Sequence, residues 1–326
     1  KEMAWPAQGK YVVTATQQGE LLIWSNTGDQ LLMRVQGHQG PTSALSTFVD
    51  RPILLSASSD KSVALWNLEE GALLKRLIGH DAGISAATIS ADGERIVTGD
   101  VSGSAIVWSG AGEKIARWRP HKSRVRMMTL SPQHDLALTS STRGVSALWR
   151  IGSGKTPQLI QQHASSSRQA VFLAPEAGGG LLSITAKGAL LRWSESGEAP
   201  ITLIEASSEG RLGVLRSDGL SVLLGDRSGE LLQYDTTSRS APRSIAHGAG
   251  AMSALGFLGN KGVIIGGSSG EIWVWPGEGE ALSLGHHEGE VVEFISSPDG
   301  RSFMSRSENQ AHMWLGPFDQ KSLQLR

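Results

Sequence analysis

The stretch that decides the fold runs from residue 53 to residue 66 and reads ILLSASSDKSVALW. Two short apolar runs flank a polar turn, and the second run ends in Trp66. Runs of this length, interrupted by Ser, Asp or Gly, are strand signals, and no helical period accompanies them. An apolar run that ends in an aromatic residue recurs along the chain at Trp24, Trp66, Trp108, Trp149, Trp193, Tyr234, Trp275 and Trp314. These eight anchors, 39 to 44 residues apart, account for essentially all 326 residues.

A histidine series runs in phase with the aromatic anchors. Its members are His38, His80, His121, His163, His247 and His286, and Gly precedes the first, second and last of them. Residues about one repeat apart lie on successive structural units, so they cannot converge on one metal ion. Each unit reads as four strands, which in the third unit span Ile84–Ser90, Arg95–Gly99, Ser104–Trp108 and Lys114–Arg119. We therefore expect an all-β repeat protein.

Gly-His at the end of a unit, Asp-Gly after its first strand and Trp at the end of its third strand together resemble the WD-repeat β-propeller family. The resemblance covers the whole chain, although the repeats are degenerate, which suggests a bacterial type. It implies a single β-propeller over residues 1–326 with four antiparallel strands in each blade. Eight anchors favour eight blades, and a seven-bladed propeller with an atypical first unit is the alternative. The expected blades span approximately residues 1–38, 39–80, 81–121, 122–163, 164–206, 207–247, 248–287 and 288–326.

The same resemblance implies a structural clamp, in which a His, a second-strand Ser and an Asp orient the edge of the Trp ring. One set matches this pattern: His38, Ser56 or Ser58, Asp60 and Trp66. The Asp position lies six residues before the aromatic anchor. Only the second unit has an Asp there, Asp60. Its equivalents are Gln18, Ser102, Arg143, Lys187, Ser228, Ser269 and Glu308. We therefore expect one complete clamp, in the second blade.

Composition and motifs argue against several functional classes. The net charge of −1 lacks the basic excess that a dedicated nucleic-acid binder needs. The absence of Cys rules out disulfides, thiolate metal sites and a Cys nucleophile. No apolar run reaches the length of a membrane-spanning helix, and no catalytic motif, phosphate-binding Gly-rich loop or metalloprotease motif is present. We expect no enzyme activity, no cofactor, no bound metal and no direct membrane insertion.

A propeller without catalytic groups is typical of an interaction scaffold, because short loops on a rigid framework carry recognition. We expect a monomeric propeller within a complex that binds a protein or peptide on one face. The alternatives are a ligand-sensing domain of a larger membrane or exported protein and an enzyme that uses the central channel. Because the chain begins at Lys1 rather than Met, we expect that an N-terminal segment was removed. Both cytoplasmic and periplasmic or exported locations stay open.

The partner-binding surface is predicted from the family's pattern, in which partners dock beside the start of each first strand and the turn between the second and third strands. These positions are small and neutral in units 2, 3 and 7 and become basic in units 4 to 6. The candidate residues are Arg124, Arg126, Arg143, Arg168, Lys187, Arg211 and Arg227. Arginine pairs with carboxylates bidentately, so an acidic protein or peptide segment is the expected partner. Few aromatic residues are available for base stacking, so nucleic acid is not expected.

Overall fold

The computed structural model of the chain is built from strands and turns. It describes residues 2–6, 9–28, 30–48, 51–131, 135–152, 156–165, 167–172, 180–205, 212–216, 219–226, 228–236, 242–245, 250–259, 262–277, 281–316 and 318, and no helix lies within these ranges. The chain separates into two compact units, residues 1–172 with 193–200 and residues 173–192 with 201–326.

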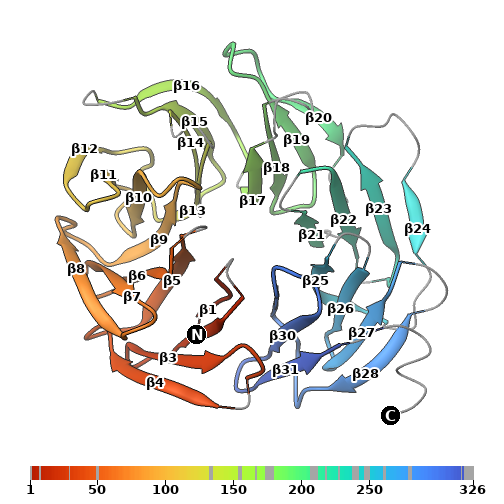
Figure 1. The fold of residues 1–326 in the computed structure, drawn as a ribbon. Coiled ribbons are helices and arrows are strands. Elements are labelled where there is room, and N and C mark those ends of the chain that lie inside the picture. Colours follow the sequence, from red (N-terminus) through yellow and green to blue (C-terminus); the bar gives the residue numbers. More distant parts are fainter. Residues whose placement is uncertain are drawn as a thin grey trace. The chain divides into compact units, whose positions relative to one another are not determined.

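The first unit contains four sheets, and each sheet is a meander of four consecutive antiparallel strands (Figure 1). Blade 1 comprises β1 (Glu2–Ala4), β2 (Tyr11–Ala15), β3 (Glu20–Ser25) and β4 (Leu31–Gln36). Blade 2 comprises β5 (Thr42–Thr47), β6 (Ile53–Ser58), β7 (Ser62–Asn67) and β8 (Ala72–Ile78). Blade 3 comprises β9 (Ile84–Ile89), β10 (Arg95–Asp100), β11 (Ala105–Ser109) and β12 (Lys114–Trp118). Blade 4 comprises β13 (Val125–Leu130), β14 (Leu136–Ser141), β15 (Ser146–Arg150) and β16 (Gln158–His163).

The remaining sheets repeat this order. Blade 5 comprises β17 (Ser167–Phe172), β18 (Leu181–Thr185), β19 (Leu190–Trp193) and β20 (Ile201–Ile204). Blade 6 comprises β21 (Leu212–Leu215), β22 (Ser221–Gly225), β23 (Leu231–Asp235) and β24 (Arg243–Ile245). Blade 7 comprises β25 (Met252–Leu258), β26 (Gly262–Gly267), β27 (Glu271–Trp275) and β28 (Leu282–His286). Blade 8 has three described strands, β29 (Glu293–Ser296), β30 (Ser302–Arg306) and β31 (Ala311–Leu315). Eight propeller blades confirm the predicted fold class, and the seven-bladed alternative is wrong.

The aromatic anchors recur because they fill the space between adjacent blades. Trp108 is only 2% exposed and packs with Leu55 and Val63 of blade 2 as well as Ile84 and Ile96 of its own blade. The side chains of the second strands, such as β6 and β10, are almost all buried. The fourth strands, such as β8 and β12, form the edges of their sheets and carry several exposed side chains. Burying a large aromatic side chain at each contact between blades stabilises the repeat, which explains the sequence period.

Candidate protein-interaction surface

The first strands of blades 2, 3, 4 and 7 carry a β-bulge near their start. In β5, Thr42 lies opposite Ser58 and Ala44 lies opposite Ala57, so that Ser43 has no partner in the ladder. The equivalent extra residues are Ser85 in β9, Arg126 in β13 and Ser253 in β25. A bulge re-aims the side chain of its extra residue, and bulges are common beside functional sites.

Three of these bulge residues are serines that connect one blade to the next. The Ser43 hydroxyl donates to the carbonyl oxygen of Ile84 at 2.6 Å, and the Ser85 hydroxyl donates to that of Val125 at 2.7 Å. Ser253 bonds the carbonyl oxygen of Val291 in the same way, at 2.7 Å. Each acceptor stands at the start of the next blade's first strand or just before it. The bulge residue therefore lies beside the residue that precedes the next bulge position.

Arg126 occupies this position in blade 4, and Arg168, 42 residues later, is its sequence equivalent on β17 of blade 5. Both side chains are exposed, as is Arg124 two residues before the bulge. Partial burial, followed by repulsion from Arg168 and Arg124, lowers the pKa of Arg126. Arg168 lies on β17, which packs against β13, the strand that carries Arg126. We call these three residues the arginine cluster.

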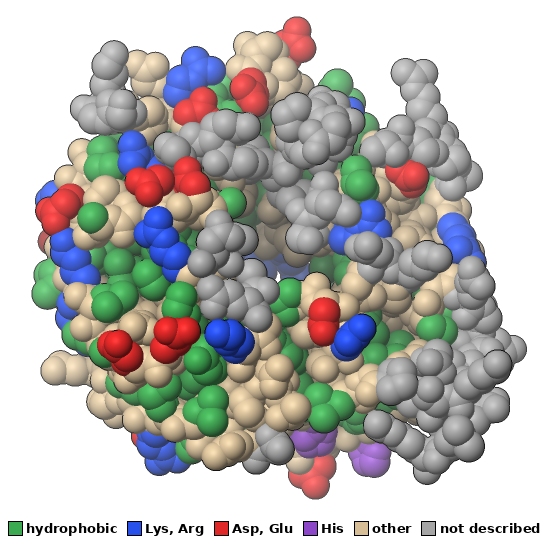
Figure 2. All heavy atoms as spheres, in the orientation of Figure 1, with side chains coloured by type: hydrophobic (Ala, Val, Ile, Leu, Met, Phe, Trp, Pro, Cys, Tyr) green, Lys and Arg blue, Asp and Glu red, His purple; other side chains and the backbone are tan. Residues whose placement is uncertain are grey.

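The arginine cluster has no counter-charge within the described residues. None of its three side chains makes a hydrogen bond or an ion pair there. Residues 122–172 include seven Lys or Arg residues and one acidic residue, Asp135. Asp135 lies beyond the opposite end of β13, where it accepts a hydrogen bond from Ser131. On the face drawn in Figure 2, by contrast, acidic and basic side chains are interspersed.

The other predicted surface residues have different positions. Arg143 is exposed in the turn between β14 and β15 but is not among the charges that act on Arg126. Lys187 is exposed in the turn between β18 and β19, in the second compact unit. Arg211 and Arg227 lie outside the described residues. The structure thus brings three of the seven candidates together.

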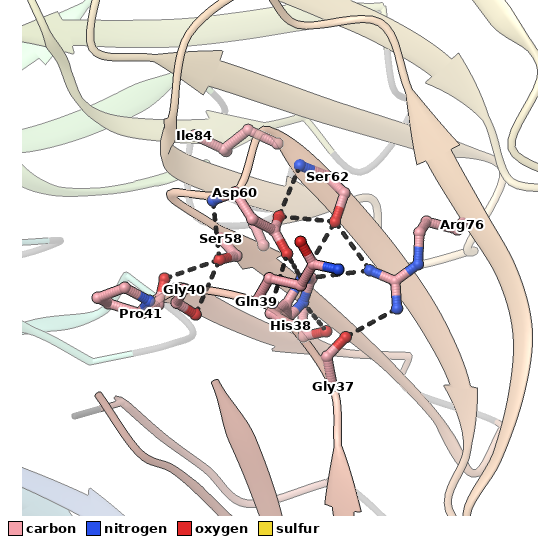
Figure 3. Close-up of polar contacts among 12 residues, drawn as sticks. Gly37, His38, Gln39, Gly40, Pro41, Ser58, Asp60, Ser62, Arg76 and Ile84 are labelled. Carbon is pink, nitrogen blue, oxygen red and sulfur yellow. Dashed lines mark hydrogen bonds and ion pairs between the residues drawn. The ribbon is translucent and has the colours of Figure 1, made fainter. Parts of the chain in front are cut away.

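The predicted clamp residues of blade 2 form a continuous hydrogen-bonded chain, and Figure 3 shows its part around His38, Asp60 and Ser62. Trp66 Nε1 donates to Ser56 Oγ at 2.9 Å, and Ser56 Oγ lies 2.8 Å from His38 Nε2. His38 Nδ1 lies 3.1 Å from Asp60 Oδ2, and Asp60 also accepts from the backbone and hydroxyl of Ser62. Ser58 stands outside this chain, because its hydroxyl donates to the carbonyl oxygens of residues 40 and 41.

Protonation in this clamp follows from burial and from the donors around the carboxylate. Burial lowers the pKa of His38 despite the attraction of Asp60. Burial opposes ionisation of Asp60, but the hydrogen bonds from Ser62 and from the backbone of Gln39 outweigh it, so the pKa of Asp60 lies below its usual range. The carboxylate is therefore charged and His38 is neutral at pH 7, with the proton on Nδ1 pointing to Asp60.

A second complete clamp in blade 3 corrects the expectation that Asp60 is the only structural Asp. Trp108 Nε1 donates to Thr98 Oγ1 at 2.9 Å, and Thr98 Oγ1 lies 2.7 Å from His80 Nε2. His80 Nδ1 lies 2.8 Å from a carboxylate oxygen of Asp100. Asp100 stands eight residues before the Trp rather than six, at the end of β10. The sequence search used a fixed spacing and missed it, although an Asp at either end of the same turn can reach the His.

In blades 4 and 8 the described residues form only part of the clamp. His121 Nε2 lies 2.9 Å from Thr139 Oγ1, which accepts from Trp149 Nε1, and no carboxylate is described at His121 Nδ1. In blade 8 the buried histidine that bonds Ser305 is His287, so the prediction that His286 holds this position is wrong. His247 lies outside the described residues. The hydrogen bonds of these sets orient the aromatic anchors Trp149 and Trp314.

Comparisons with known proteins agree with this geometry. The family model "WD domain, G-beta repeat" (WD40) matches residues 29–67 and 71–109. The U5 small nuclear ribonucleoprotein 40 kDa protein of Pongo abelii is 29% identical over 58 residues, which are 18% of this chain and 16% of that protein. The crystal structure of the computationally designed Ika8 protein covers 96% of this chain and 95% of its own with a TM-score of 0.77, at 22% identity.

The four-stranded blades and their clamps define a β-propeller, and its residues 29–67 and 71–109 match the repeats of the WD40 family. Propellers of this family are generally non-enzymatic scaffolds for protein interactions. Within the described residues, no helix is long and apolar enough to cross a membrane. The same residues contain no group of three His, Asp or Glu side chains that could hold a metal ion.

Proposed function

We propose that this protein is a non-catalytic scaffold that binds an acidic protein or peptide segment at the arginine cluster of blades 4 and 5. The proposal rests on the change of residue type, from Ser to Arg, at the bulge position. Blades 2 and 3 hold serines there that bond to the next blade, whereas blades 4 and 5 hold exposed arginines. An unpaired guanidinium can pair a carboxylate with two parallel hydrogen bonds.

The turn beside the cluster provides a second recognition element. The backbone N–H of Thr142 donates to the carbonyl oxygen of Arg124 at 3.1 Å, which holds the turn between β14 and β15 against the start of β13. Thr142 is exposed in this turn, so its hydroxyl is accessible to a partner. A rigid sheet that presents both cations and a hydroxyl fits an extended acidic segment better than it fits an apolar surface.

The test is the triple variant Arg124→Glu, Arg126→Glu and Arg168→Glu. The probe is a short fluorescein-labelled peptide of alternating Gly and Glu, measured by anisotropy at low and physiological ionic strength. We expect the wild-type protein to bind it with an affinity that falls as salt rises, and the variant to bind at least about tenfold more weakly. The control, Arg51→Glu with Lys114→Glu and Arg301→Glu, makes the same change in net charge at exposed positions elsewhere. Equal losses in both variants would reject the arginine cluster as the site.

A further inference from the structure

We infer that a pocket at the ends of β21, β25 and β29 binds a small aromatic carboxylate, a ligand that goes beyond the proposed function. The pocket has a volume of about 340 Å³, within the range of about 300–1,000 Å³ that is typical of small-molecule sites. The residues that line it all belong to the second compact unit. On β25 they lie at the opposite end from the bulge, since the bulge is at Ser253 and the lining includes Phe257 and Gly259.

The only charged residue among the described lining residues is Arg216, at the end of β21. Its backbone N–H donates to the carbonyl oxygen of Ser221, five residues later, at 3.0 Å. The same bond to the residue five positions later is made in blades 3, 4 and 8 by Ser90, Ser131 and Ser297. Arg216 therefore occupies the position that a serine holds in three other blades.

Those three serines close the turn between the first and second strands. Each is buried, and its hydroxyl oxygen accepts a hydrogen bond from the backbone N–H of the residue five positions later, at 2.9 to 3.1 Å. An arginine side chain has no acceptor, so Arg216 cannot make this bond. Sequences depart from their own local pattern at functional sites, and here the departure places a cation in the wall of a pocket.

The charge of the described lining favours an anion. Arg216 is half-buried, and a partly desolvated guanidinium pairs more strongly with a carboxylate than an exposed one does. None of the described lining residues is acidic. Asp299 follows the lining residue Pro298, but its carboxylate accepts hydrogen bonds from the Ser297 hydroxyl and from the backbone N–H of Arg301.

Two phenylalanines of adjacent blades provide an aromatic wall. Phe257 and Phe294 both line the pocket, and both are only half-buried. Phe294 lies against the bare backbone of Gly256, where an added Cβ would be 3.1 Å from the Phe294 Cβ. The Phe294 ring also packs edge-on against Phe303, with ring centroids 5.9 Å apart. The Ser296 hydroxyl donates to the carbonyl oxygen of Phe257 at 2.5 Å, which joins the two blades at the pocket.

One guanidinium and two phenyl rings together fit an aromatic ring that is joined to a carboxylate by a short chain. The guanidinium can form two parallel hydrogen bonds with the carboxylate, and the ring can pack against Phe257 and Phe294. A small inorganic anion would leave the aromatic wall without contacts. A neutral apolar molecule would gain nothing from Arg216.

The experiment measures the binding of phenylpropanoate to the full chain by isothermal titration calorimetry. Phenylpropanamide lacks the charge and propanoate lacks the ring, and we expect each to bind at least about tenfold more weakly. Arg216→Ser should weaken the binding of phenylpropanoate at least about tenfold. It should not lower the urea midpoint, because it restores the serine of blades 3, 4 and 8. The control, Arg51→Ser, changes an exposed arginine in the corresponding turn of blade 2 and should leave binding unchanged.

The tripeptide Gly-Gly-Phe, with a free or an amidated carboxyl terminus, identifies the source of the carboxylate. Binding of the free acid more tightly than phenylpropanoate would assign the pocket to the terminal residue of a polypeptide, and the reverse order would assign it to a free small molecule. Equal affinities for phenylpropanoate and its amide would overturn the inference. Unchanged binding by a folded Arg216→Ser variant, or no binding of either aromatic acid by the wild-type protein, would also overturn it.

Discussion

The imidazole of His80 and the carboxylate of Asp100 lie 2.8 Å apart, and both side chains are almost completely buried. Burial lowers the pKa of His80. Burial opposes ionisation of Asp100, yet the Ser102 hydroxyl and His80 more than compensate, so the pKa of Asp100 lies below its usual range. A buried carboxylate with this many donors fixes the tautomer and the orientation of the histidine. Through Thr98 it also fixes the ring of Trp108 between two blades.

Asp100→Ala should lower the free energy of unfolding by about 1–3 kcal/mol, because it leaves buried donors on His80 and on the following turn without an acceptor. Asp60→Ala should have a cost in the same range. Lys187→Ala is the control, since its side chain is exposed. Urea denaturation of the three variants provides the comparison, and an unchanged midpoint for Asp100→Ala would contradict the assigned role.

The stability of blade 4 should depend on pH through His121. Burial lowers the pKa of His121 to about 4, and it stays near 6.5 when the chain is unfolded. Between these values the unfolded chain binds more protons, so stability is complete above pH 6.5 and is lost as pH falls toward 4. The full loss is roughly 3 kcal/mol for this residue. His121→Gln should therefore lose less stability than the wild type between pH 7 and pH 4.5, and identical pH profiles would show that His121 does not carry the effect.

The serine hydroxyl that connects two blades should contribute measurably to stability. Ser85→Ala removes the bond to the Val125 carbonyl oxygen and should cost about 0.5–1.5 kcal/mol. Ser85→Thr keeps the hydroxyl and should stay close to the wild type. Thermal melts of the two variants distinguish this bond from a general effect of changing the bulge, which would lower both melting temperatures equally.

Two glycines at equivalent positions in neighbouring blades allow the cost of backbone strain to be measured separately from the cost of steric overlap. Gly103 and Gly144 both lie in the turn between second and third strands, with φ of +91° and +79°. A Cβ on Gly103 would overlap the carbonyl oxygen of His121, whereas a Cβ on Gly144 would meet nothing within 4 Å. Gly144→Ala should cost about 1–2 kcal/mol from strain alone. Gly103→Ala should cost roughly 2 kcal/mol more, since the backbone must move. Equal urea midpoints would refute the steric part of this account.

The candidate surface could be predicted only in part from the sequence. The positions beside each first strand pointed to Arg124, Arg126 and Arg168, because the start of an apolar run can be found by inspection. The bulge at Arg126 could not be predicted, because it depends on how β13 pairs with β14 across the sheet. Arg143, which the sequence placed next to these positions, lies in the turn between β14 and β15 and is not among the charges that act on Arg126.

The sequence by itself determined the repeat and the all-β class, and it favoured eight blades over seven. An aromatic residue at the end of each third strand fills the contact between blades, and that packing requirement imposes a period that can be counted. Tertiary structure alone decided which polar groups meet. Asp60 and Asp100 stand at different distances from their Trp, and His287 rather than its neighbour His286 turns inward. The reason is that a hydrogen bond depends on where turns and bulges place atoms in space, while sequence spacing records only position along the chain.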